Sequence, residues 1–172
     1  MRRAARLIFP LLLLLAACQS PQPPAPVAQP RAARPAARPV PARVEGAWSF
    51  GVAGDRCTAQ VAHREATLGI TAGPEKQVTF SATSPTRRAS GRARLVFRGD
   101  DGSWEAPARG TGRSALATIP LDERGEAHIR DLLGGGTASV QGAGVELPAL
   151  GVPDAGVSGR DWYGCVARVA ER

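Results

Sequence analysis

Three cysteines and two histidines are the residues of this sequence that could most readily do chemistry. They are Cys18, Cys57 and Cys165, with His63 and His128. Redox and zinc sites commonly use two cysteines spaced as Cys-x-x-Cys, and no two of these cysteines have that spacing. We therefore expect no metal site and no cofactor, and we interpret both histidines as solvated surface residues.

Signatures of common catalytic sites are also missing from the sequence. It contains no Gly-x-Ser-x-Gly, no His-Glu-x-x-His and no phosphate-binding loop. The glycines at 134–136 follow a predicted helix, whereas the glycines of a phosphate loop precede one. We predict that the protein has no catalytic residues and is not an enzyme.

The N-terminal segment, residues 1–17, has the order of a secretory signal peptide. Three arginines precede an apolar run of 11 residues that ends in small side chains. A membrane-spanning helix needs about 20 apolar residues, so this run is too short to cross a bilayer. The sequence Leu15-Ala16-Ala17-Cys18 resembles the lipobox of bacterial lipoproteins, which implies cleavage before Cys18 and acylation of that residue. An ordinary signal peptide is the alternative interpretation.

Acylation of Cys18 would anchor the mature protein to membrane lipid without crossing the membrane. Each buried CH₂ contributes about 0.8 kcal/mol, so several acyl chains make a stable anchor. Gln19 stands where enteric lipoproteins retained in the inner membrane carry an aspartate. By that resemblance we expect a Gram-negative cell envelope, with the outer membrane favoured over the inner membrane.

Residues 18–43 form a predicted tether between the anchor and a folded domain. The segment after the cysteine consists almost wholly of Pro, Ala, Arg, Gln and Val, a composition that favours extended polyproline conformation, rising about 3.1 Å per residue. A polyproline ligand for a partner domain is the alternative.

Net charge argues against nucleic acid as a partner. Seven of the 22 basic residues and none of the 15 acidic residues lie at 1–43. The segment 44–172 therefore holds 15 of each, with no basic excess to neutralise phosphates.

The segment 44–172 has the pattern of one β-rich globular domain. Short alternating apolar runs are separated by turn signals every 8 to 12 residues. We predict a mainly β fold, a single small antiparallel β-sandwich or β-barrel with one short helix and one disulfide. The helix is predicted within 121–133, where acidic residues precede an apolar stripe.

The clearest hairpin is predicted at 92–110. Its first strand alternates apolar residues with arginines, including Arg98, and Asp101-Gly102 supplies the turn. Pro107 lies in the return strand and has no N–H for a ladder, so we expect a sheet edge or the end of pairing there.

The two remaining cysteines form an even pair in an exported chain once Cys18 is assigned to lipid. An oxidising compartment favours their pairing, so we predict a disulfide between Cys57, in the second strand, and Cys165, in the last one.

A candidate binding surface consists of Trp162, Tyr163 and Arg98. The two aromatic residues precede Cys165, where they either face a ligand or pack beside the disulfide. Arg98 begins an Arg-Gly-Asp tripeptide that integrins can read in exposed loops, although the same residues also suit an ordinary turn.

Four segments together resemble the invasion-associated locus B family of alphaproteobacteria, small secreted β-proteins. They are GAWSF at 46–50, IRDLLGGG at 129–136, VELPALG at 145–151 and WYGC at 162–165. The resemblance implies an envelope protein with a host-interaction role and no settled enzymatic activity.

Gly46-Ala47-Trp48 followed by Cys57 also resembles the opening of small β-barrel protease-inhibitor lipoproteins. We therefore expect a membrane-anchored binding or accessory module with an envelope or host protein as partner. An inhibitor of an exported protease is the first alternative, and a periplasmic enzyme with a site assembled from distant residues is the second.

Overall fold

A computed structural model describes residues 45–100, 102–142 and 147–172. The predicted signal peptide, the tether with Cys18 and Asp101 of the predicted turn lie outside these residues. The chain divides into the units Met1–Arg38 and Pro39–Arg172, and the fold below is that of the second. No helix in the described ranges is long and apolar enough to cross a membrane.

The described residues form nine strands, two α-helices and a short 3₁₀ helix. The strands are β1 Trp48–Ala53, β2 Arg56–Ala62, β3 Thr67–Gly73, β4 Gln77–Thr83, β5 Gly91–Arg98, β6 Ser103–Thr111, β7 Ser114–Pro120, β8 Gly136–Gly142 and β9 Leu147–Val152. The helices are α1 Glu123–Leu133, η1 Gly156–Gly159 and α2 Arg160–Glu171.

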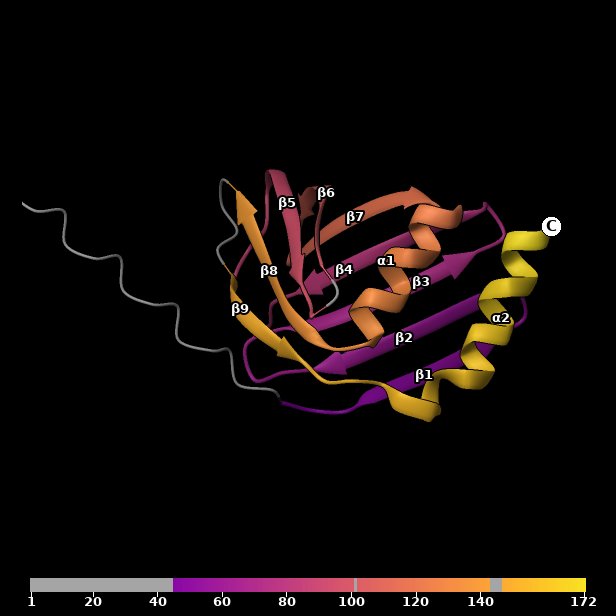
Figure 1. Ribbon diagram of the computed structural model, residues 1–172. Helices are drawn as coiled ribbons and strands as arrows, with labels where there is room; N and C mark the ends of the chain where they lie inside the picture. Colours follow the sequence, from indigo (N-terminus) through magenta and orange to yellow (C-terminus); the bar gives the residue numbers. More distant parts are fainter. Residues whose placement is uncertain (1–44, 101, 143–146) are drawn as a thin grey trace, which may run out of the picture. The chain divides into compact units, whose positions relative to one another are not determined.

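All nine strands belong to one antiparallel sheet that curls into a half-barrel (Figure 1). Their order is β1-β2-β3-β4-β7-β6-β5-β8-β9. The consecutive strands β5, β6 and β7 form a meander, and its last strand, β7, lies beside β4. The predicted mainly β, antiparallel fold is confirmed. Of the two predicted forms, a sandwich or a barrel, the single curled sheet is closer to the barrel. The prediction of one helix was wrong, because the segment at 160–171 is also helical.

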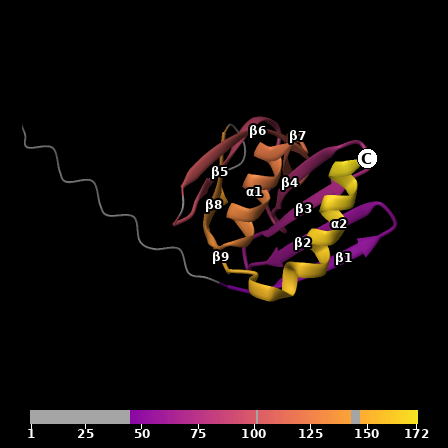
Figure 2. The ribbon, with the colours of Figure 1, turned by 45° about the vertical axis from the view of Figure 1, so that its right-hand side comes forward.

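Both α-helices lie against the same face of the sheet (Figures 1 and 2). Strand residues that face them are apolar at alternate positions, as in β2, where Cys57, Ala59 and Val61 are buried. An aromatic cluster fills the core, in which the Trp104 ring lies 5.2 Å from Phe80 and 5.4 Å from Phe97, measured between ring centroids. Trp104 of this core also contacts α1, through the stacked ring of His128.

Helix α1 begins where the sequence predicts it. The Asp122 side chain accepts a hydrogen bond of 2.9 Å from the Gly125 amide and so caps the helix N-terminus. Three residues on one face of the helix are buried against the sheet: Ile129, Leu132 and Leu133. The chain then leaves the helix at Gly134 and enters β8.

Candidate functional site

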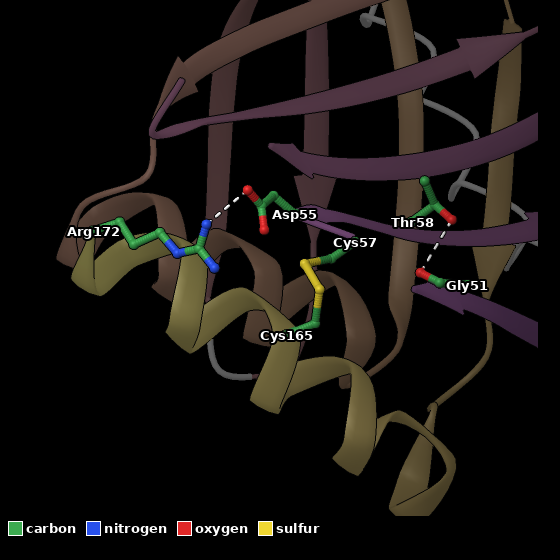
Figure 3. The surroundings of a disulfide bond; sticks show 6 residues. All are labelled: Gly51, Asp55, Cys57, Thr58, Cys165 and Arg172. Carbon is green, nitrogen blue, oxygen red and sulfur yellow. Dashed lines mark hydrogen bonds and ion pairs between the residues drawn. A yellow bond between two sulfur atoms is a disulfide. The ribbon is translucent and has the colours of Figure 1, made fainter. Parts of the chain in front are cut away.

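The predicted disulfide between Cys57 and Cys165 is present (Figure 3). Both cysteines are buried, and their Cα atoms lie 5.9 Å apart. Cys57 lies in β2 as expected, but Cys165 lies in α2, so the prediction of a final strand at that position was wrong. The bond therefore joins the sheet to the last helix.

Trp162, one of the three residues of the predicted binding surface, is a core residue. Only 1% of it is exposed, and its ring centroid lies 5.9 Å from that of Phe50 in β1. Trp162 precedes Cys165 by three residues in α2, which places both on the helix face that packs on the sheet. The interpretation of Trp162 as a ligand-facing residue is therefore corrected, and the packing interpretation holds.

Tyr163 and Arg98 reach the surface at different places. Tyr163 is half-buried and lines a hollow of ≈ 210 Å³ between α1 and α2, together with Glu126 and Arg130. Burial raises the pKa of the Tyr163 phenol above its usual value. Arg98 is exposed at the end of β5, opposite Ser103, and does not line that hollow.

His128 is stacked on the core tryptophan instead of standing free in solvent. Its ring lies 4.3 Å from that of Trp104, with 13° between the ring planes. Within the described structure, His128 Nδ1 and Trp104 Nε1 are buried without a hydrogen-bond partner. Burial lowers the pKa of His128, and Asp131 opposes that shift. The lowered pKa favours the neutral form of the imidazole. Burial likewise lowers the pKa of His63.

The ladder between β6 and β7 is interrupted beside this stacked pair, and we call this interruption the β6–β7 opening. These strands pair only at Arg109↔Leu116 and at the next two positions, up to their connecting turn. Continuing the same register would place Pro107 opposite Thr118 and Glu105 opposite Pro120. Pairing with β5 continues through Pro107, so its nitrogen points away from β5 and towards β7.

Two prolines explain the opening. Along a strand, the backbone N–H and C=O groups of every second residue face the same neighbouring strand. By this alternation, Pro107 and Pro120 each stand at a position where an N–H would bond across β6 and β7, and the two positions are consecutive in the continued ladder. A proline has no N–H, so each position lacks a ladder bond. The expectation that Pro107 marks the end of pairing is confirmed on its β7 side.

Hollows border the opening on both faces of the sheet. The outer hollow, of ≈ 580 Å³, includes Pro107, Arg92, Arg109, Leu116 and Thr118 among its lining residues. The inner hollow, of ≈ 290 Å³, lies next to α1 and is lined by residues that include Glu105, Ala106, Pro107, Ile119 and His128. Pro107 belongs to both.

Two arginines stand directly opposite each other at the outer hollow. Arg92 and Arg109 are a cross-strand pair on β5 and β6, and both are exposed. Like charges in such a pair destabilise a sheet. Arg94 is paired with Glu105 at 3.0 Å, but the side chains of Arg92 and Arg109 have no ion pair or hydrogen bond within the described residues. Two adjacent guanidinium groups suit a carboxylate or another oxyanion.

Sequence reasoning found only part of this candidate site, defined as the β6–β7 opening with Arg92 and Arg109. The alternation at 92–98 places Arg92 on the outer face, and Pro107 marks the end of pairing. Arg109 and Pro120 were missed, because their significance depends on which strands are neighbours. The periodicity of β6 could have placed Arg109 on the face of Arg92.

No set of three or more His, Cys, Asp or Glu side chains in the described ranges is placed to hold a metal ion. Comparisons with protein-family models, curated proteins and solved structures found no match to this chain. The candidate site is therefore interpreted from its own geometry.

Proposed function

We propose that this protein is a lipid-anchored binding module of a Gram-negative cell envelope, and that it acts by holding a protein partner. The observation that carries the proposal is the β6–β7 opening, where exposed arginines without ion-pair partners border an interrupted ladder. The partner belongs to the envelope or to a host, as the resemblance to the locus B family implies. No step of chemistry is assigned to the module.

The sequence before the domain supplies the anchor in this proposal. Cys18 carries the acyl chains, residues 18–43 space the domain from the lipid, and the outer membrane is the expected location. The buried disulfide supports an exported protein, because such bonds persist in oxidising compartments and are rare in the cytosol.

Metabolic labelling with a palmitate analogue tests the anchor. We expect the wild-type protein to be labelled and to sediment with outer-membrane fractions, and the Cys18→Ser variant to be unlabelled. Labelling that survives Cys18→Ser, or a wild-type protein without label, would contradict lipidation.

Cross-linking in intact cells tests the binding function. A photoreactive residue at Thr118 lies in the outer hollow, and one at Val157, which is exposed at η1, serves as the matched control. We expect one envelope or host protein to be captured from Thr118 only. Capture of an exported protease would support the inhibitor alternative, and identical captures from both positions would argue against a site at the opening.

A further inference from the structure

Arginines gather at one end of the half-barrel, on the loop at 84–90 and the turn at 112–113. We propose that this rim lies on anionic lipid headgroups and so orients the domain on the membrane. The rim is defined by three exposed arginines: Arg87, Arg88 and Arg113. The inference rests on the proposed Cys18 anchor for the nearness of lipid, whereas the rim itself belongs to the described domain.

Backbone hydrogen bonds join the loop and the turn of the rim to each other. The Ser84 amide donates to the Arg113 carbonyl at 2.9 Å, and the Ala89 amide donates to the Gly112 carbonyl at 2.7 Å. The hydroxyl of Ser84, a buried residue, also accepts a bond of 3.0 Å from the Arg87 amide. The loop is held at both of its ends, so the backbone that carries the three arginines is fixed.

The rim lies at the end of the sheet where the chain enters β1. Strand pairing connects the first residue of β1 with the first residue of β5 through one cross-strand row: Trp48, Val61, Leu68, Ala82, Ala115, Gly110 and Gly91. Both parts of the rim lie beyond this row, on the side from which the chain enters β1. In Figure 1 the arrowheads of β2 and β4 point to this same end. The proposed tether at 18–43 therefore joins the domain at the end that carries the rim.

Charge has opposite signs at the two ends of this sheet. The connections among β1 to β7 at the tether end carry four arginines and one glutamate, and they are 63–66, 84–90 and 112–113. The connections at the opposite end carry four acidic residues and one lysine, and they are 54–55, 74–76 and 99–102. A negative surface attracts the positive end of such a domain and repels the other.

The chemistry of the rim suits headgroups better than a protein surface. Stable protein interfaces centre on buried apolar or aromatic residues. The rim offers no such anchor, since the exposed large hydrophobic side chains of the described chain lie elsewhere, at Val52, Leu116 and Val157. A guanidinium group forms paired hydrogen bonds with phosphate oxygens, which every phospholipid headgroup supplies. The three arginines therefore fit a bilayer that carries net negative charge.

Sedimentation with vesicles of known composition tests the inference. The protein is the full mature chain with Cys18→Ser, which keeps the tether and the domain but has no acyl chain. The vesicles consist of phosphatidylcholine alone or of equal parts of phosphatidylcholine and phosphatidylglycerol. The rim variant combines Arg87→Gln, Arg88→Gln and Arg113→Gln. The matched control loses the same charge at three exposed arginines outside the rim: Arg56→Gln, Arg160→Gln and Arg168→Gln.

We expect the protein to bind only the vesicles with phosphatidylglycerol. Each basic residue near an anionic surface strengthens binding by about fivefold, so the rim variant should bind about 100-fold more weakly. The control variant should bind within about twofold of the unsubstituted chain, because charges farther from the surface than a Debye length are screened.

A nitroxide label on a chain with all its arginines measures the orientation directly. Ser90→Cys places the label in the loop of the rim, and Ser103→Cys places it at the opposite end of β6; both positions are exposed. The length of β6, from Ser103 to Thr111, separates the two ends by about 26 Å. We expect nickel-chelating lipid headgroups to relax the label at position 90 and not the label at position 103.

The inference is overturned if the chain fails to bind anionic vesicles, or if the rim variant binds as well as the unsubstituted chain. The arginines of the tether would account for binding in the second case. Equal losses in the rim and control variants, or equal relaxation of the two labels, would also overturn it. Binding of polyglutamate with the same arginine dependence, without binding to vesicles, would assign the rim to an acidic protein. Vesicle binding by a protein that takes up no palmitate label would contradict the anchor and leave the rim contact in place.

Discussion

Removing the disulfide should destabilise the domain by several kcal/mol. The perturbation is the double substitution Cys57→Ala and Cys165→Ala, which breaks the bond without leaving an unpaired thiol. The bond closes a loop with a sequence separation of 108 residues. For a loop of that length, the chain-entropy model gives about 4.8 kcal/mol at 25 °C.

That loss is comparable with the whole stability of many domains, which is about 5–15 kcal/mol. The bond also holds α2 to the sheet, since this helix packs mainly against β1, β2 and β3. Without it, the helix is retained by its buried face around Trp162, Val166 and Val169 and by the exposed ion pair of 2.7 Å between Arg172 and Asp55. We therefore expect α2 to open before the rest of the sheet unfolds.

Urea unfolding followed by circular dichroism measures the change in the free energy of unfolding, and hydrogen exchange measures the opening of α2. Cys18→Ser is the matched control, because it replaces a cysteine outside the bond. A loss below about 1 kcal/mol in the double variant would refute the loop-closure argument. Equal rates of amide hydrogen exchange in α2 and β4 would refute the expectation that the helix opens first.

Three further predictions concern α1 and the opening beside it. Asp122→Ala removes the cap from the Gly125 amide and should cost about 1 kcal/mol in urea unfolding, whereas Asp122→Asn should cost less; equal losses would contradict the capping role. Because burial lowers the pKa of His128 in the folded state, the unfolded state binds more protons than the folded state as the pH falls through 6.5. The free energy of unfolding should therefore fall below that pH, and His128→Gln should flatten the decline. An unchanged pH profile of stability in His128→Gln would contradict this. Pro107→Thr restores an N–H opposite Thr118, so exchange of the Thr118 amide should slow by about tenfold in hydrogen-exchange NMR; an unchanged rate would show that the missing donor does not keep the strands apart.

Local periodicity was sufficient to predict much of the sheet. The hairpin at 92–110 follows from the alternation of apolar residues with arginines, and Leu95 and Phe97 are buried while Arg94 is exposed. The start of α1 follows from Asp122 and the acidic first turn. These features depend on neighbours within a few residues, which a single sequence displays directly.

Helix α2 and the strand order could not be predicted in the same way. Trp162, Cys165, Val166 and Val169 have helical spacing, but the expected pairing of Cys165 with the second strand favoured a last strand. The placement of β7 beside β4 has no local signal, because it joins residues far apart in the chain. The candidate site depends on that placement, so only Arg92 and Pro107 could be identified beforehand.

The position of Cys57 also determines how the domain would respond to mechanical load. A pull through the proposed tether enters at Trp48 and would peel the edge strand β1 from β2, starting at the Trp48↔Val61 pair. The hydrogen bond of 2.7 Å from the Trp48 indole to the Pro153 carbonyl resists the first step. Peeling that passes the turn after Ala53 reaches Cys57 and meets a covalent bond to α2. An extending force would therefore release one strand and then stop, leaving the β6–β7 opening intact under tension.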